Sequence, residues 1–248
     1  MKNENLEAAL QTPPPSKPSG VLLINKPKGS TSFRLVSLLR RLCDVQKIGH
    51  AGTLDPFATG VMILLVGKDF TKLSDRFLTQ DKEYIATLRL GIRTDSYDCE
   101  GEVVSQSDLP ISEELVQQTL SKFQGSILQT PPMFSAKKVN GKKLYELARK
   151  GITIPRAQVP VTVNIQYLTY EYPFLTINVS CSMGTYIRSL AEDIGLALGC
   201  GAHLSELTRT RSGSFHLADC FDGTLLTDPK SLEKLRFIPV NQLDITQN

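Results

Sequence analysis

A single carboxylate, Asp55, lies in a segment suited to chemistry. Residues 49–60 read Gly-His-Ala-Gly-Thr-Leu-Asp-Pro-Phe-Ala-Thr-Gly, so Asp55 lies among three glycines and directly before Pro56. We expect this segment to be a twelve-residue polar loop. Proline disfavours helical dihedral angles in the residue before it, which restricts the backbone that carries the carboxylate. An arbitrary Asp-Pro in a glycine-rich loop is more often a plain turn, so a catalytic role for Asp55 depends on its companions.

Other catalytic schemes find little support in the sequence. The dipeptide Gly67-Lys68 precedes Asp69 and lacks the spacing of a P-loop. The three histidines lie in no recognisable nucleophile motif. No residue is identifiable as the second acid of a glycosidase-like pair with Asp55. The sequence therefore offers a lone carboxylate.

A zinc site is the main metal alternative. The stretches Cys200-x2-His203 and His216-x3-Cys220 imitate the ligand spacing of zinc fingers. A structural zinc finger is a small module without its own core, whereas these stretches run into apolar, arginine-bearing sequence that looks integral to a larger domain. We therefore expect no bound metal.

Length and composition indicate an ordinary globular protein. The 248 residues, 41% of them hydrophobic, are sufficient for one large domain or for a domain with an appendage. The longest apolar run, Val61–Val66, is far shorter than the roughly 20 residues that cross a bilayer, and no signal sequence opens the chain. The five cysteines are odd in number and scattered, which favours reduced thiols over a framework of disulfides. We expect a cytoplasmic protein.

The charge is distributed unevenly, although the net charge is only +3. One stretch, residues 137–156, carries seven basic residues against the single acid Glu146, and residues 81–114 lean acidic. A basic cluster of this kind is typical of a surface that contacts phosphates, although many charge runs are merely solvated. Its basic residues are Lys137, Lys138, Lys142, Lys143, Arg149, Lys150 and Arg156.

Hydrophobic patterns predict the elements that must position these groups. A strand at residues 21–24 precedes a helix capped by Ser30 or Thr31. That helix presents leucines to the core and Arg34, Arg40 and Arg41 on its other face. The run 61–66 is a buried strand, and residues 83–90 alternate as a half-buried strand that contains Tyr84. We expect Val103 to begin a strand that pairs with this one.

The second half of the chain contains further helices and strands without regular strand–helix alternation. Helices are predicted from Ser112 to Phe123, near Lys142–Lys150, and over residues 187–198 with Arg188 in the first turn. Strands are predicted at residues 161–167 and 175–181. This order favours an α+β fold with a mixed, mainly antiparallel β-sheet flanked by helices over a doubly wound fold.

Taken together, these stretches resemble the TruB family of tRNA pseudouridine synthases. Residues 49–60 are similar to the family's catalytic motif, and five further stretches follow the family's order over about residues 20–216. They are Ile24-Asn-Lys-Pro-Lys-Gly29, Lys82-Glu-Tyr-Ile-Ala86, Pro131-Pro-Met-Phe-Ser-Ala-Lys137 with Gly141-Lys-Lys-Leu-Tyr145, Cys181-Ser-Met-Gly-Thr-Tyr-Ile-Arg-Ser-Leu190, and His203-Leu-Ser-Glu-Leu-Thr-Arg-Thr-Arg-Ser-Gly213.

The resemblance implies a pseudouridine synthase fold and a set of catalytic residues. Asp55 matches the catalytic carboxylate, which either attacks the uridine or abstracts a sugar proton; the sequence leaves both open. Arg188 matches the arginine that pairs with it, and a guanidinium favours the ionised carboxylate. Tyr84 matches the tyrosine that stacks on the target base and assists proton removal.

The resemblance also implies residues that bind the substrate. His50 matches the histidine that fills the space left by the flipped base, Leu207 a leucine that lines the pocket, and Lys26 a supporting lysine. Residues 131–156 match a thumb-like RNA-binding insertion, in which Lys137, Lys142, Lys143 and Lys150 are expected to contact phosphates.

From these matches we expect three parts in the chain. They are a disordered leader (1–19), a pseudouridine synthase catalytic domain (20–220) that contains the thumb-like insertion, and a short C-terminal extension (221–248). Only 32 residues follow His216, too few for a complete RNA-binding domain of the PUA type.

The resemblance implies a tRNA pseudouridine-55 synthase that flips and isomerises the T-loop uridine. Its partner is the T arm of tRNA, and we expect it to act as a monomer without cofactor or metal. Two alternatives stay open: a tRNA chaperone that needs no catalysis, and the catalytic subunit of a guide-RNA complex.

Overall fold

The computed structural model describes residues 17–139 and 141–243. The predicted leader lies outside the described residues except for residues 17–19, which precede the first strand. No helix within the described ranges is long and apolar enough to cross a membrane.

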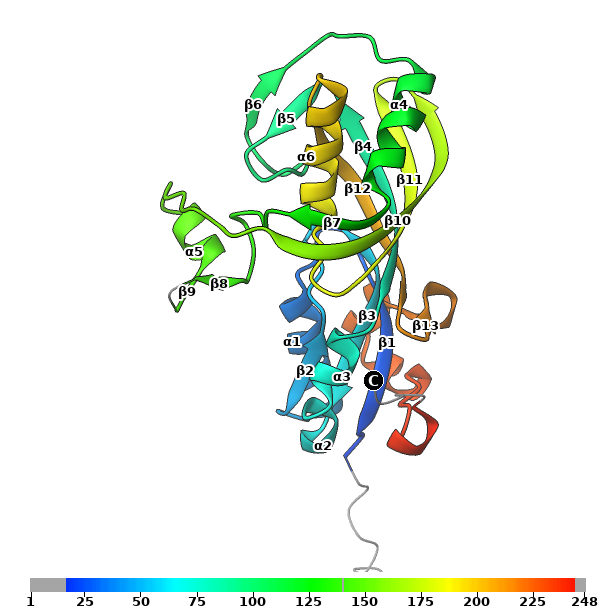
Figure 1. Ribbon diagram of the computed structural model, residues 1–248. Helices are drawn as coiled ribbons and strands as arrows, with labels where there is room; N and C mark the ends of the chain where they lie inside the picture. Colours follow the sequence, from blue (N-terminus) through cyan, green and yellow to red (C-terminus); the bar gives the residue numbers. More distant parts are fainter. Residues whose placement is uncertain (1–16, 140, 244–248) are drawn as a thin grey trace, which may run out of the picture.

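One ten-stranded sheet forms the centre of the molecule (Figure 1). Its strands are β1 (Gly20–Lys26), β2 (Ile48–Ala51), β3 (Thr59–Val66), β4 (Lys82–Leu90), β7 (Gly125–Gln129), β10 (Val159–Glu171), β11 (Phe174–Cys181), β12 (Ala202–Ser212), β13 (Phe215–His216) and β14 (Phe221–Asp222). Eight of them follow the order β14-β1-β3-β12-β4-β11-β10-β7, while β2 pairs with β3 and β13 with β12. Only the β1–β14 and β3–β12 pairings of this sheet are parallel. The predicted mixed, mainly antiparallel α+β fold is confirmed.

The described residues form six α-helices, which lie against the sheet except for α5. They are α1 (Ser32–Cys43), α2 (Lys68–Thr71), α3 (Ser74–Leu78), α4 (Glu113–Leu120), α5 (Leu144–Ala148) and α6 (Ile187–Leu198). The side chain of Thr31 caps α1 and that of Ser112 caps α4, as predicted. Gly199 ends α6 in the left-handed conformation that glycine tolerates. Short 3-10 turns follow α4 and fill the C-terminal part, residues 217–242.

The strands β1 and β3 are buried on both faces, which explains the continuous apolar run in β3. Leu22, Met62 and Leu64 pack into the large core beneath α1 and α6. Val21 and Ile63 point to the opposite face, into a second cluster that contains Phe70 and Phe77. In contrast, β4 alternates between buried and more exposed residues, because only one of its faces is covered.

Two expectations about local structure are wrong. The segment of residues 49–60 is not wholly a loop, because residues 49–51 belong to β2 and residues 59–60 to β3. The irregular part, residues 52–58, is called the Asp55 loop below. A strand does begin at Val103, but this β6 (Val103–Gln106) pairs with β5 (Ile92–Thr94) in a separate hairpin instead of with β4.

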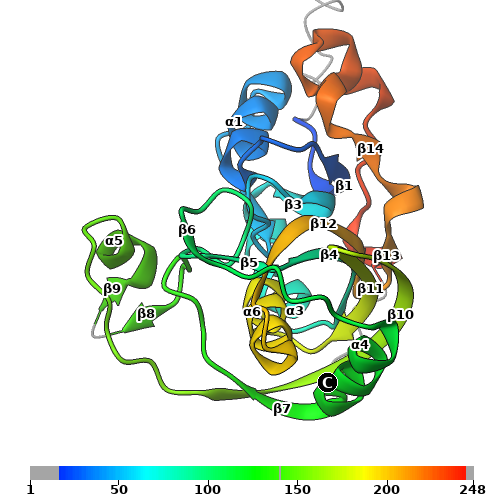
Figure 2. The ribbon, with the colours of Figure 1, turned by 90° about the horizontal axis from the view of Figure 1, so that it is seen from above.

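Residues 131–156, called the thumb below, leave the sheet between the neighbouring strands β7 and β10. They carry α5 and a small hairpin of β8 (Lys138–Val139) and β9 (Lys142–Lys143). The thumb stands away from the sheet in both views (Figures 1 and 2). The C-terminal residues return to the sheet instead, where Ile238 exchanges two backbone hydrogen bonds of 2.9 Å with Val21.

Candidate active site

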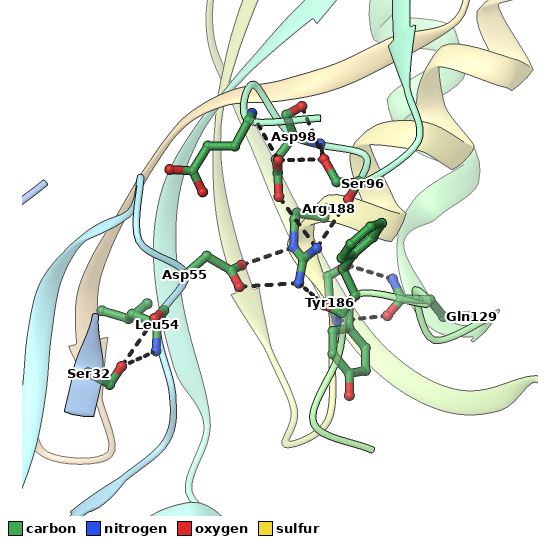
Figure 3. Close-up of polar contacts among 10 residues, drawn as sticks. Ser32, Leu54, Asp55, Ser96, Asp98, Gln129, Tyr186 and Arg188 are labelled. Atoms are coloured by element: carbon green, nitrogen blue, oxygen red, sulfur yellow. Dashed lines mark hydrogen bonds and ion pairs between the residues drawn. The ribbon is translucent and has the colours of Figure 1, made fainter. Parts of the chain in front are cut away.

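The Asp55 loop is fixed to the start of α1 and to the turn after β1. The Oγ atom of Ser32 accepts from the backbone N of Leu54 at 3.0 Å and donates to its carbonyl at 3.1 Å (Figure 3). The carbonyl of Pro56 accepts from the backbone N of Gly29 at 2.8 Å. Because Asp55 lies between Leu54 and Pro56, its backbone is held from both sides.

Arg188, in the first turn of α6, forms a two-pronged ion pair with Asp55. Its Nε lies 2.9 Å from Oδ2 of Asp55, and its Nη2 donates to Oδ1 at 3.2 Å (Figure 3). The side chain of Arg188 is only 6% exposed, whereas that of Asp55 is 32% exposed. The guanidinium is therefore enclosed, and the carboxylate keeps an open side toward solvent or a substrate.

The other donors of Arg188 are occupied by groups that the sequence did not indicate. Nη1 donates to the carbonyl of Ser96 at 3.1 Å and lies 3.4 Å from Oδ2 of Asp98, and Nη2 donates to the carbonyl of Phe134 at 2.7 Å. Asp98 also accepts from the hydroxyl of Ser96 at 2.6 Å. Asp98 lies in a tight turn, 43 residues from Asp55 in the chain, so no spacing rule would link it to the loop.

Burial and charge act in opposite directions on Asp55. Loss of hydration raises the pKa of its carboxyl, while the Arg188 guanidinium opposes that rise and the Asp98 carboxylate adds to it. Lys26 also works to lower the pKa of Asp55. Arg188 is thus the strongest influence that favours the ionised carboxylate.

Asp55 and Arg188 open onto a pocket of about 400 Å³. Tyr84 and Leu207, predicted from the sequence, line this pocket from the neighbouring strands β4 and β12. Burial raises the pKa of the Tyr84 hydroxyl, so the side chain is a neutral phenol at physiological pH. A pocket with an aromatic ring, an aliphatic side chain and a carboxylate suits a flat, polar, uncharged ring.

A buried arginine in the same pocket, Arg209, was missed by sequence reasoning. It is 1% exposed, and its guanidinium donates to the carbonyls of Val61 at 2.7 Å and Gly52 at 3.2 Å. No carboxylate of the described chain forms an ion pair with it. Its sequence signal was weak, because Arg209 is one of two arginines in β12 and its neighbours in the chain are half-exposed.

Lys26 and His50 do not line the pocket. Lys26 is fully buried, and its Nζ donates to the carbonyls of Ser30 at 2.6 Å, Pro27 at 3.0 Å and Pro56 at 3.1 Å. Burial lowers the pKa of Lys26 to about 8. This geometry supports the loop instead of offering the ammonium to a ligand.

His50 lies on β2, opposite Leu64 of β3, and its buried Nδ1 has no hydrogen-bond partner among the residues that the structure describes. Burial, aided by the charge of Arg209, lowers the pKa of His50, so the ring is neutral at physiological pH. It does not line the pocket in this conformation. Its predicted contact with RNA stays a prediction.

The root of the thumb is joined to the first turn of α6. The side-chain amide of Gln129 accepts from the backbone N of Tyr186 at 2.7 Å and donates to its carbonyl at 3.0 Å (Figure 3). The hydroxyl of Ser189 donates to the carbonyl of Thr130 at 3.0 Å. Together with the Arg188–Phe134 contact, these bonds fix the thumb root beside the pocket.

The predicted phosphate-binding lysines lie on the thumb itself and do not line the pocket. Lys142 and Lys150 are exposed, and Lys137 and Lys143 are half-buried. The Nζ of Lys143 lies 5.4 Å from the centre of the Tyr145 ring, on which Arg149 also packs. The four lysines therefore form a separate basic surface beside the pocket.

The described residues contain no cluster of three or more His, Cys, Asp or Glu side chains placed to hold a metal ion. His203, one of the residues with zinc-like spacing, is buried and its Nδ1 lies 2.8 Å from the carbonyl of Ile92. This imidazole is engaged with the backbone.

Fold and site together define a class of enzyme that acts on RNA bases, and comparison with known proteins identifies the family. The model of the TruB family pseudouridylate synthase (N terminal domain) matches residues 40–187. The model of the tRNA pseudouridylate synthase B C-terminal domain matches residues 188–235. The chain belongs to the TruB family of pseudouridylate synthases, which are isomerases. The boundary between the two matches falls between Ile187 and Arg188, inside α6.

Two curated relatives show how far the similarity extends. The chain is 58% identical to tRNA pseudouridine synthase B of Protochlamydia amoebophila (strain UWE25) over 230 residues, which cover 93% of this chain and 87% of the relative. It is 46% identical to the protein of the same name from Francisella tularensis subsp. tularensis (strain WY96-3418) over 223 residues, which cover 89% of this chain and 74% of the relative.

A solved structure extends the similarity to the fold. A chain in the crystal structure of a Cbf5-Nop10-Gar1 complex superposes with a TM-score of 0.67 at 33% sequence identity. The match covers 87% of this chain and 55% of the other, so this chain spans about half the length of that structural relative.

Proposed function

We propose that this protein is a tRNA pseudouridine synthase that isomerises the uridine at position 55 of the T loop. The observation that carries the proposal is the paired Asp55–Arg188 at the mouth of a pocket lined by Tyr84 and Leu207. The names of the curated relatives support tRNA as the substrate.

The reaction breaks the bond between N1 of uracil and the ribose, turns the base, and joins C5 to the same sugar carbon. N1 gains the proton that C5 loses, so the change is redox-neutral and needs no group donor. The ionised Asp55 either attacks the nucleotide or takes a sugar proton, and Arg188 keeps the carboxylate ionised and oriented for both routes.

The pocket residues hold the base while it turns. Tyr84 and Leu207 offer an aromatic and an aliphatic wall to a flipped uracil. Extrusion from the loop costs a few kcal/mol, which contacts with the pocket and the RNA backbone must offset. We propose that Lys26 acts as a positioning residue, because its ammonium is fully occupied by carbonyls beside Asp55.

We further propose that the protein acts as a monomer in the cytoplasm and contacts the T arm of tRNA with its thumb. All five cysteines are free, which suits a reducing compartment. The thumb lysines and the catalytic domain together would bind the RNA. The domain boundaries at residues 19 and 220 also stay proposals.

The decisive test compares wild type with Asp55→Asn on an unmodified T-arm RNA, with pseudouridine measured in the product. Wild type should form pseudouridine, and Asp55→Asn should bind the RNA with unchanged affinity and form none. Asp108→Asn, which changes an exposed acid outside the pocket, should behave as wild type. If wild type binds and refolds the RNA without modifying it, the chaperone alternative replaces the enzyme.

The guide-RNA alternative is less well supported. The Cbf5 match is a partial one, whereas the tRNA pseudouridine synthase B relatives match this chain over most of both lengths. Activity of the isolated protein on T-arm RNA, with no guide RNA added, would exclude it.

A further inference from the structure

The outer face of α1 carries a basic stripe that the proposed chemistry does not use. Phe33, Ser37, Arg40 and Arg41 follow the spacing of one helix face, and Arg34 lies beside them. The stripe borders an open hollow of about 520 Å³, which is lined by Ser37, Arg40, Arg41, Asp44 and Gln46. Phe33, Arg34 and Arg41 are exposed on this face.

The positive charge of the stripe is not neutralised within the described chain. Arg34, Arg40 and Arg41 take part in no ion pair there. The acid at the end of the stripe, Asp44, already contacts Lys17 at 2.6 Å. Two of the arginines lie in the last turn, where the helix dipole favours cations, but Arg34 lies in the first turn, where it does not. The dipole therefore does not explain the stripe.

An exposed aromatic ring accompanies the arginines. Phe33 is 62% exposed, and the guanidinium of Arg40 lies 5.7 Å from the centre of its ring. Exposed apolar rings are unfavourable in water, and an aromatic ring among arginines is typical of surfaces that bind RNA, where bases stack and phosphates pair. This composition favours RNA over an acidic protein.

The stripe begins next to the Asp55 loop. Ser32, the residue before Phe33, makes both hydrogen bonds to Leu54 next to Asp55. A helix of 12 residues is about 18 Å long, so Arg40 and Arg41 lie farther from the pocket than one nucleotide reaches. In both views α1 and the thumb lie on the same side of the molecule (Figures 1 and 2).

We propose that the outer face of α1 is a second RNA-binding surface, which contacts the phosphate backbone of the substrate RNA beyond the flipped nucleotide. Ser32, at the start of α1, and Gln129, beside the thumb, lie on opposite sides of Asp55 (Figure 3), so the two surfaces would contact the RNA on both sides of the flipped nucleotide. This inference takes the identity of the RNA, tRNA, from the proposed function. A measurement of RNA binding tests it independently of catalysis.

The test is the double variant Arg34→Gln/Arg41→Gln, which removes two charges whose side chains donate no hydrogen bond in the described chain. The dissociation constant for a labelled T-arm hairpin is measured over a range of salt concentrations. We expect binding to weaken about five- to tenfold at low salt, and the slope of log K against log salt to fall by roughly 0.7 to 0.9 for each lost phosphate contact. The single-turnover rate at saturating RNA should not change, which also shows that the variant is folded.

Two further variants sharpen the result. Asp44→Asn removes the acid of the stripe and keeps a residue that tolerates the left-handed backbone there, so binding should tighten about two- to threefold. The matched control Arg89→Gln/Lys122→Gln removes two exposed charges from β4 and the turn after α4, and its binding should equal that of wild type.

An affinity and a slope of Arg34→Gln/Arg41→Gln equal to those of wild type would overturn the proposal. Loss of a dimer in sedimentation, with RNA binding intact, would also overturn it and identify the face as an interface between two copies. A wild type that binds this hairpin through α1 but forms no pseudouridine would instead refute the proposed function alone.

Discussion

At the scale of single residues, Arg188 is the main group that favours the ionised form of Asp55 against the effect of burial. Its guanidinium touches both oxygens of Asp55 and is itself fixed by Asp98, Ser96 and the carbonyl of Phe134. Asp98 lies on the other side of the guanidinium and shares its charge. The carboxylate is therefore paired with a cation that has little freedom to move.

The pH dependence of the reaction should report this pair. Asp55 must be ionised, so activity falls as the pH drops through its pKa. Burial raises that pKa above the ordinary value of 3.8. In a plot of the single-turnover rate against pH, the fall on the acidic side should therefore be centred above pH 3.8. Arg188→Met removes the charge that most lowers the pKa of Asp55. The acidic limb of the pH profile of the remaining activity should therefore move to higher pH.

Arg93→Met is the matched control, because Arg93 pairs with Glu192 instead of Asp55. It should leave the acidic limb in place. A limb that stays fixed in Arg188→Met would contradict the assigned electrostatics. Carbon-13 NMR titration of the Asp55 carboxyl provides a readout that does not depend on turnover.

At the scale of elements, the close approach of β3 to β12 holds the pocket together. Gly60 lies opposite Arg209 in the parallel pairing of these strands, directly after the Asp55 loop. Its φ is +110°, and a Cβ atom there would lie 2.2 Å from the carbonyl oxygen of Arg209. Backbone atoms on a central strand have no room to shift, so only glycine fits.

We expect Gly60→Ala to lower the free energy of unfolding by on the order of 3 kcal/mol, since it combines a backbone clash with left-handed strain. Gly199→Ala is the control: its φ is +81° but no atom lies near the added methyl group, and the expected cost is about 1 kcal/mol. Urea unfolding of the three proteins measures both values. Equal costs for the two variants would refute the packing argument.

At the scale of the whole molecule, two basic surfaces, the thumb and the outer face of α1, are far apart in the sequence. The thumb leaves the sheet between β7 and β10, and α1 lies below it on the same side (Figure 1). Hydrogen bonds of Gln129 and Ser189 fix the start of the thumb to the beginning of α6, the helix that carries Arg188.

Replacing Lys142, Lys143 and Lys150 with Ala should weaken tRNA binding roughly tenfold and flatten its salt dependence, because phosphate contacts release counterions. The measurement is the dissociation constant as a function of salt. The control changes Lys122, Lys230 and Lys234, three exposed lysines outside the thumb, to Ala. A slope unchanged from wild type in the thumb variant would show that phosphates are contacted elsewhere.

Much of the fold follows from local sequence patterns. The alternation in β4, the cap residues Thr31 and Ser112, and the apolar run of β3 each depend on neighbouring residues, so they are readable from the chain. The pairing of β6 with β5 was not readable, because this hairpin is held by distant residues, as in the ion pair between Arg93 of β5 and Glu192 of α6.

The sequence by itself indicated the family and named Asp55, Tyr84, Arg188 and Leu207 as candidate site residues, because these lie in continuous motifs, and the structure brings the four to one pocket. Only the tertiary structure decided that Asp98 and Arg209 belong to the site and that Lys26 supports the loop. The reason is physical: burial and hydrogen-bond partners depend on atoms brought together from distant parts of the chain, and no local pattern encodes them.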